Sequence, residues 1–348
     1  MLTNIFIYWL GILPLVIYKG HYEVPKVFIF LLGGFFLTLF WSWKSMKLKR
    51  EDLFNKKDYL FLLWLLILFV SGLLSANPLQ SILGGSYRYQ GFIFFLTLFL
   101  IGKTISVLNS SKKHLLQKVV ASTLLIEGLL IVFQELSGNT YFGKSLGTLG
   151  EASAVAGFLA IGSYFVLQVF PKLFTYILSM PIMLTTSRAG ILSYSIILFN
   201  SLIKRFKPMI VILVVGTLFI LLQLSKGKSL STFENRPLIW TMATEAIKEQ
   251  PFIGYGAESQ ERIYDLAFTK REIPLLGLIV DRAHNIFLDI AIWTGFLGLI
   301  VFLTWIWMEL KDIKDSNRRI AIFAFFVFAS FQPLSVVHWI LLIFLFNI

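Results

Sequence analysis

Hydrophobic residues recur along this chain in long blocks separated by short polar breaks. Each block holds about 15 to 20 residues, enough to cross a hydrocarbon core of roughly 30 Å as an α-helix. A helix also satisfies its own backbone hydrogen bonds in lipid. The pattern predicts twelve membrane-spanning helices, at approximately residues 4–18, 25–43, 59–75, 91–109, 119–136, 152–170, 173–187, 189–203, 209–224, 284–308, 320–331 and 336–348.

Composition supports the same interpretation. Of the 348 residues, 57% are hydrophobic and 14% charged, and the mean hydropathy is +0.78, values far from those of a soluble domain. We therefore expect an all-α polytopic membrane protein. The first span lacks a basic start and a small-residue cleavage site, which predicts a retained helix rather than a removed signal peptide. The chain has no cysteine, which excludes disulfides and thiolate metal ligands.

The net charge of +12 has a topological explanation. With a cytoplasmic N-terminus, the predicted cytoplasmic segments hold 18 basic and six acidic residues, which accounts for the whole net charge. This is the positive-inside distribution of a membrane protein rather than a surface for nucleic acid. It also predicts that both termini are cytoplasmic. The segments are residues 44–58, 103–118, 172, 204–207 and 309–319.

One polar segment, residues 225–283, is too long to be a simple connector between the ninth and tenth spans. The topology places it outside. Within it, Pro237 in a first turn and Pro251 as a terminator predict a helix of about fourteen residues that begins near Arg236. We expect one membrane domain, residues 1–348, with this external loop as a cap. The apolar face of the loop helix would comprise Leu238, Ile239, Met242, Ala243 and Ile247.

Three external residues suggest phosphate and proton chemistry. Arg188, in "TTSRAG", carries a donor fork suited to phosphate, although an interfacial arginine among headgroups is an equal explanation. Arg236 opens the loop helix, where backbone N–H groups favour anions, unless it is a solvated loop charge. His284 can deprotonate an acceptor hydroxyl with Asp281 orienting it, or is an ordinary interfacial histidine. Together Arg188, Arg236 and His284 could hold a pyrophosphate leaving group and activate a hydroxyl.

Further candidates accompany these three. Arg88 lies between Tyr87 and Tyr89 in "GGSYRYQGF", where tyrosines stack on sugar rings or belong to an interfacial aromatic belt. Glu127 and Asp289 lie inside predicted spans, which favours a proton or ion path unless a buried partner explains them. Arg88, Arg282, Asn285 and Trp240 are the residues that we expect to contact substrate.

Metal and cofactor chemistry have little support in the sequence. The chain contains no HExxH or CxxC motif and no external DxD pair. We therefore expect arginine to meet phosphate charge, with no metal and no cofactor.

Four segments together resemble the O-antigen ligase/polymerase family of bacterial membrane glycosyltransferases: "GTLGEASAVAGFLA" (147–160), "TTSRAG" (185–190), "RPLIWTMATEAIKEQPFIGYG" (236–256) and "DRAHNIFLDIAIWTGFLG" (281–298). The segment "GGSYRYQGF" is similar to a further family stretch, so the resemblance covers about residues 84–300. It implies a GT-C-like fold and glycan transfer from an undecaprenyl-diphosphate donor on the outer face of the cytoplasmic membrane.

The resemblance also assigns roles to single residues. It implies that Arg188 and Arg236 engage the diphosphate and that His284 is the base that activates the acceptor. Ser153 is a departure, because relatives often have asparagine there.

The sequence is also compatible with other functions. Within the same family, the chain would be a ligase, a polysaccharide polymerase or a protein O-oligosaccharyltransferase. A bicarbonate-type transporter would use Glu127 and Asp289. A structural partner in an envelope assembly would make His284 dispensable. The sequence leaves open whether the acceptor is lipid A core, a growing chain, a protein or a wall polymer.

Overall fold

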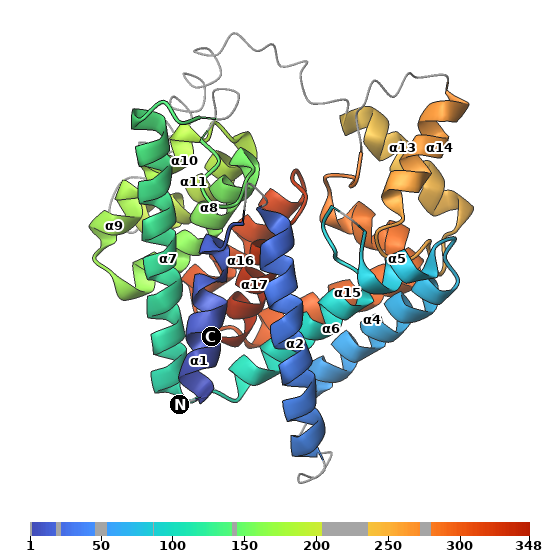
Figure 1. Ribbon diagram of the computed structural model, residues 1–348, viewed down its shortest axis with the longest axis horizontal. Helices are drawn as coiled ribbons and strands as arrows, with labels where there is room; N and C mark the ends of the chain where they lie inside the picture. Colours follow the sequence, from blue (N-terminus) through green and yellow to red (C-terminus); the bar gives the residue numbers. More distant parts are fainter. Residues whose placement is uncertain are drawn as a thin grey trace. The chain divides into compact units, whose positions relative to one another are not determined.

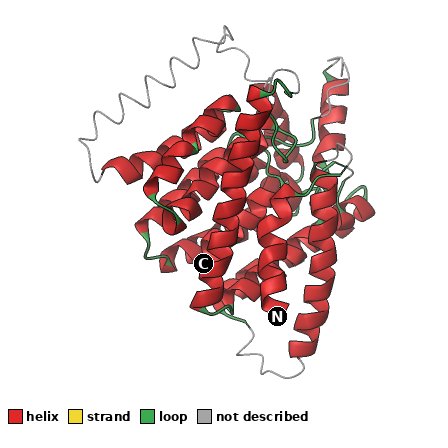
Figure 2. Ribbon diagram, turned by 60° about the vertical axis from the view of Figure 1, so that its left-hand side comes forward, coloured by secondary structure: helices red, strands yellow, loops and turns green. Residues whose placement is uncertain are grey.

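The structure is a computed structural model that describes residues 2–18, 22–45, 54–85, 87–140, 145–203, 236–271 and 280–348. Each regular element in these ranges is a helix, as Figure 2 shows. The chain divides into two compact units. Unit one comprises Met1–Lys26, Ile105–Phe233 and Ile313–Ile348, and unit two comprises Val27–Thr104 and Glu234–Asp312.

Unit one is built around α8 (Ala152–Val169), which is buried along nearly its whole length. Small residues allow its neighbours to approach closely. A Cβ atom on Gly157 would lie 2.2 Å from the ring of Phe328 in α16, so only glycine fits there. The described helices of this unit are α1 (Leu2–Ile12), η1 (Leu13–Leu15), α7 (Ser110–Leu136), α8, α9 (Lys172–Ile177), α10 (Ser179–Leu184), α11 (Arg188–Ile203), α16 (Ser316–Ala329) and α17 (Val336–Asn347).

Unit two combines long apolar helices with the helices of the predicted external loop. Helix α15 (Ile286–Asp312) packs along α4 (Lys56–Leu73), and α13 (Arg236–Glu249) packs against both α15 and α14 (Gln260–Lys270) (Figure 1). Asparagine side chains cap two helix starts, Asn55 before α4 and Asn77 before α5 (Pro78–Leu83). Two further helices are shared with unit one. The first turn of α2 (Glu23–Ser45) and the last two residues of α6 (Phe92–Ser106) belong to unit one, and the rest of each helix belongs to unit two.

Each predicted span except residues 209–224, which lie outside the described residues, coincides with helical structure. Among the described helices, those at Glu23–Lys44, Ser110–Leu136, Ala152–Val169 and Ile286–Asp312 are long and apolar enough to cross a membrane. Shorter apolar helices cover Thr3–Leu15, Phe92–Ser106, Lys172–Leu184 and Val336–Asn347. The chain is therefore an α-helical membrane protein.

One predicted span differs from the structure because of proline. Residues 173–187 form two short helices, α9 and α10, which meet at Leu178. Pro181 lacks a backbone N–H, and its ring occupies the space of the carbonyl four residues earlier, at Ile177. The helix therefore lacks the hydrogen bond from residue 181 to the carbonyl of Ile177, although the N–H of Leu178 still donates to Phe174 (3.2 Å) and its carbonyl accepts from Ile182 (3.2 Å).

Helix α15 is interrupted as well, at Gly295, whose φ of 63° and ψ of −171° are not helical. The segment Pro251–Gly256 docks against this interruption. The N–H groups of Tyr255 and Gly256 donate to the carbonyls of Ile292 (2.8 Å) and Trp293 (3.0 Å). Backbone groups that the interruption releases are thus paired by a neighbouring loop, which is how a broken helix is tolerated away from water.

Candidate functional site

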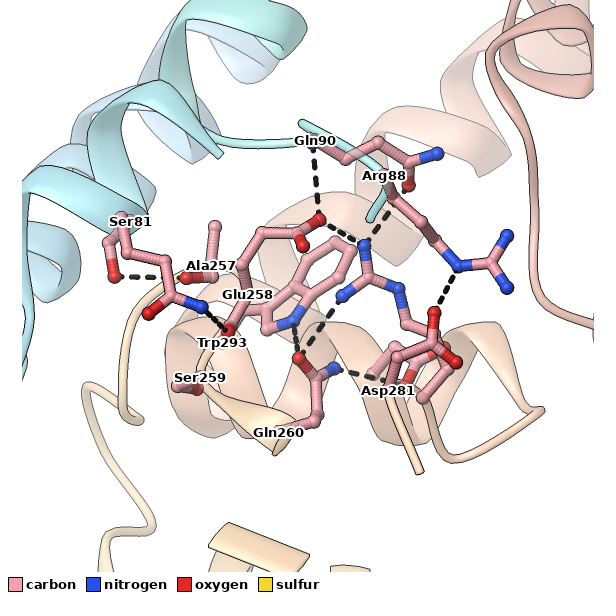
Figure 3. Close-up of polar contacts among 12 residues, drawn as sticks. Ser81, Arg88, Gln90, Ala257, Glu258, Ser259, Gln260, Asp281 and Trp293 are labelled. Carbon is pink, nitrogen blue, oxygen red and sulfur yellow. Dashed lines mark hydrogen bonds and ion pairs between the residues drawn. The ribbon is translucent and has the colours of Figure 1, made fainter. Parts of the chain in front are cut away.

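Three loops of unit two converge on a group of polar side chains, all of them buried except the half-buried Asp281. Residues 87–91 follow α5, residues 254–259 precede α14, and residues 280–285 precede α15. Figure 3 shows that side chains from the three loops, among them Arg88, Glu258 and Asp281, lie close together. We call this group the buried polar cluster; it comprises Arg88, Gln90, Glu258, Gln260, Asp281, Arg282, Asp289 and Trp293.

Arg282 lies at the centre of the cluster and is only 2% exposed. Its guanidinium forms an ion pair with Glu258 and hydrogen bonds to the side-chain oxygens of Gln260 (3.2 Å) and Gln90 (3.3 Å). It also lies 4.7 Å from the ring centre of Trp293, a cation–π arrangement. Its guanidinium thus joins residues of all three loops, and the predicted contact of Arg282 with substrate remains a prediction.

Arg88 and Asp281 form the second ion pair of the cluster. Burial alone would raise the pKa of the Asp281 carboxyl, but the guanidinium groups of Arg88 and Arg282 outweigh burial and lower this pKa. Asp281 is therefore ionised at neutral pH. Its carboxylate faces Arg88 (Figure 3), and its expected role in orienting His284 remains a prediction.

Asp289 connects the cluster to the backbone of the 280–285 loop. It is 5% exposed, and its Oδ1 atom accepts hydrogen bonds from the N–H of Ala283 (2.8 Å) and from Nε2 of Gln260 (3.1 Å). An acid in an apolar helix thus has protein partners, one of the explanations that the sequence left open.

His284 and Asn285 form the junction between this loop and α15. His284 adopts a left-handed backbone conformation, with φ of 55°, which is uncommon for a residue with a side chain. The side-chain oxygen of Asn285 accepts from the N–H groups of Phe287 (3.0 Å) and Leu288 (3.3 Å), so it caps α15. A substrate contact by Asn285 remains a prediction.

Helix α13 brings Arg236 and Trp240 to unit two. Its bounds, Arg236–Glu249, confirm the predicted fourteen-residue helix. Of the predicted apolar face, Ile239, Met242, Ala243 and Ile247 are buried and Leu238 is half-buried. The indole Nε1 of Trp240 donates to the carbonyl of Ala283 (2.9 Å). One turn of α13 therefore separates Arg236 from a residue that contacts the 280–285 loop.

Arg188 belongs to unit one, where it is the first residue of α11. The hydroxyl of Ser187 accepts from the N–H of Gly190 (3.3 Å), which caps the helix start. Gly190 in turn allows α11 to approach α8, because a Cβ there would lie 2.4 Å from that of Ala156. These contacts explain serine and glycine in "TTSRAG". The joint action of Arg188, Arg236 and His284 in one site remains a prediction.

Glu127, the other acid in a predicted span, is buried in unit one beside the "GTLGEAS" segment. It accepts hydrogen bonds from the N–H (2.6 Å) and the hydroxyl (2.7 Å) of Thr148. The ammonium group of buried Lys26 donates to the carbonyl of the same Thr148 (2.7 Å). Glu127 thus has protein partners as Asp289 does.

Four members of the buried polar cluster were not predicted from the sequence: Gln90, Glu258, Gln260 and Trp293. Glu258 and Gln260 follow the paired glycines of "GYG", and Gln90 follows Arg88 in "YRYQG". Polar side chains directly after tight, glycine-rich turns near a span were the available signal. Among the described residues, no group of three metal-ligating side chains is placed to hold a metal ion, so the expectation of a metal-independent reaction stays a prediction.

Comparison with known proteins agrees with the motifs. Residues 146–303, which contain Arg188, Arg236 and His284, match the family model described as O-antigen ligase. The ComP-specific O-oligosaccharyltransferase of Acinetobacter baylyi is 25% identical over 353 residues, a match that covers 87% of this chain and 62% of that relative. The chain thus spans less than two thirds of the relative's length. Residues 146–303 are thus similar to the O-antigen ligase family, in agreement with the resemblance of the sequence motifs.

Proposed function

We propose that this chain transfers a glycan from an undecaprenyl-diphosphate donor to an acceptor hydroxyl. Arg188 and Arg236 would neutralise the diphosphate as it leaves, and His284 would remove the proton of the attacking hydroxyl. Attack from the face opposite the diphosphate inverts the anomeric centre. Neither a metal nor a cofactor takes part in this scheme.

One observation in unit two carries the proposal. Trp240, one turn after Arg236, donates to the carbonyl of Ala283, the residue before His284. Two of the three proposed catalytic residues therefore lie close to the two ends of a single tertiary hydrogen bond. This supports a shared site for diphosphate and acceptor, because the reacting groups of donor and acceptor must meet within about 3.5 Å.

The proposal includes a topology. The chain would be a GT-C-like single membrane domain, residues 1–348, with twelve spans in the cytoplasmic membrane and both termini cytoplasmic. Residues 225–283 would form the external loop, so the reaction would take place on the outer face. The positive-inside distribution of lysine and arginine supports this orientation.

The test is complementation of a deletion strain, with mass spectrometry of its envelope glycans. Wild-type protein should restore the glycosylated product, and Arg188→Ala, Arg236→Ala and His284→Ala should each reduce it at least about 100-fold. Arg262→Ala is the matched control, because Arg262 is an exposed arginine of α14. Full product with both arginine variants would overturn the assignment. Purified protein should release undecaprenyl diphosphate in step with product.

The acceptor has a second candidate. The similarity to an O-oligosaccharyltransferase favours a protein hydroxyl as acceptor over a lipid or polysaccharide hydroxyl. The same mass spectrometry distinguishes them, because a protein acceptor yields glycopeptides that disappear in the deletion strain. A ligase or polymerase would instead change lipid-linked or polymeric glycan.

Transport is less well supported than glycan transfer by the contacts of the two buried acids. The acids that would line its path, Glu127 and Asp289, accept hydrogen bonds from backbone and side-chain groups of the protein. Flux into proteoliposomes that contain no glycan donor would favour transport over transfer.

A further inference from the structure

The peptide groups around Ala283 are held from both sides by side chains. Its N–H donates to Oδ1 of Asp289 at 2.8 Å, and its carbonyl accepts from Nε1 of Trp240 at 2.9 Å. Ala283 itself is fully buried. The two contacts come from different helices, α15 and α13, so they fix this short stretch of loop relative to both.

The residue that follows is His284, in its left-handed conformation. Such a conformation is disfavoured for a residue with a Cβ atom, and it persists where the surroundings determine it. Here Ala283 is held before His284, and Asn285 caps α15 after it. The position of the imidazole thus depends on neighbours that hold the backbone on either side.

Asp289 is itself oriented by the buried polar cluster. The side-chain oxygen of Gln260 accepts from Nε1 of Trp293 (2.7 Å) and from Arg282 (3.2 Å). The Gln260 amide nitrogen is therefore directed at Asp289, to which it donates. In both contacts Asp289 serves as a hydrogen-bond acceptor through one oxygen atom.

We propose that Asp289 and Trp240 are positioning residues for His284, acting through the Ala283 peptide groups. The inference rests on the proposed function, because it assumes that His284 activates the acceptor. In this proposal Asp289 acts by accepting hydrogen bonds, whereas a proton or ion path would require its negative charge.

Two substitutions of Asp289 separate these roles. Asp289→Asn keeps an oxygen that accepts from Ala283 and Gln260, and should retain turnover within about threefold of wild type. Asp289→Ala removes the acceptor and should lower kcat about 100-fold with little change in KM, as expected when a reacting group is misplaced by about 1 Å. Equal inactivity of both variants, each folded by thermal melting and gel filtration, would overturn the proposal.

Trp240→Phe tests the other contact. It removes the indole donor and keeps an aromatic ring, and should also lower kcat more than it changes KM. Thr241→Val is the matched control, because Thr241 is exposed on the same helix and its hydroxyl donates within α13, to the carbonyl of Pro237. Unchanged kcat in Trp240→Phe would contradict a positioning role for Trp240. This variant keeps the proposal testable even if Asp289→Ala fails to fold.

The His284→Ala background distinguishes this inference from the proposed function. If Asp289 acts through His284, Asp289→Ala should slow the residual transfer of His284→Ala by less than about twofold. An equal loss in both backgrounds would overturn the positioning role and leave the proposed function standing. Full transfer by His284→Ala alone would instead overturn the proposed function.

Discussion

Replacing Arg282 with methionine tests whether the buried polar cluster holds unit two together. Methionine fills a similar volume but cannot pair with Glu258, which is itself buried. The change leaves a carboxylate inside the protein without its guanidinium partner. The side-chain oxygens of Gln90 and Gln260 lose a donor as well.

The expected loss of stability follows from the burial of the Arg282–Glu258 ion pair. Arg282 and Glu258 side chains are 2% and 8% exposed, so solvent screens their attraction little. Removing one partner of a buried ion pair costs about 3–5 kcal/mol, mainly through the charge left behind. We therefore expect opening of unit two to become more frequent by roughly two to four orders of magnitude. Glu258→Gln combined with Arg282→Met removes that charge and should recover part of the loss.

The assay is limited proteolysis of purified protein, with thermal melting followed by tryptophan fluorescence. Arg262→Met is the control, because it makes the same change at an exposed position on α14. Arg282→Met should be cleaved far faster and melt at a lower temperature than Arg262→Met. Equal stability of these two variants would refute the structural role of Arg282, and so would a double variant less stable than Arg282→Met.

Two further predictions concern backbone and charge. Gly295→Ala places a Cβ 2.3 Å from the backbone of Phe252, so it should lower the melting temperature. The loss should exceed that of Gly138→Ala, the control, where φ is also positive but no atom lies near the added Cβ. Similar losses in the two variants would contradict the docking of the loop against α15. Because the folded pKa of Asp281 is lowered, its ion pair with Arg88 is complete at neutral pH and is lost as pH falls through that pKa. The melting temperatures of wild type and Asp281→Asn should differ by a constant amount from pH 8 to 5 and converge below about pH 4; convergence already between pH 7 and 5 would refute this.

Local sequence patterns predicted the helices better than they predicted the contacts within the candidate site. The fourteen residues of α13 begin at Arg236 and end before Pro251, as proline placement and apolar spacing predict. The interruption at Gly295 was not predicted, because an apolar run has the same hydropathy whether its helix is continuous or broken. What permits the interruption is donation by Tyr255 and Gly256, about forty residues away in sequence.

The sequence alone determined the class of protein, the positions of most helices and the residues that resemble a glycosyltransferase site. These depend on hydropathy, helix-start and helix-stop residues and short motifs, which are local properties. Only the tertiary structure decided what the polar residues near His284 contact. Arg282, a substrate candidate by its position in "DRAHN", lies in the interior with Glu258, and Asp289, a candidate for an ion path, holds the peptide of Ala283. A buried charge must find its partner wherever the fold supplies one, and that partner is set by packing between distant segments.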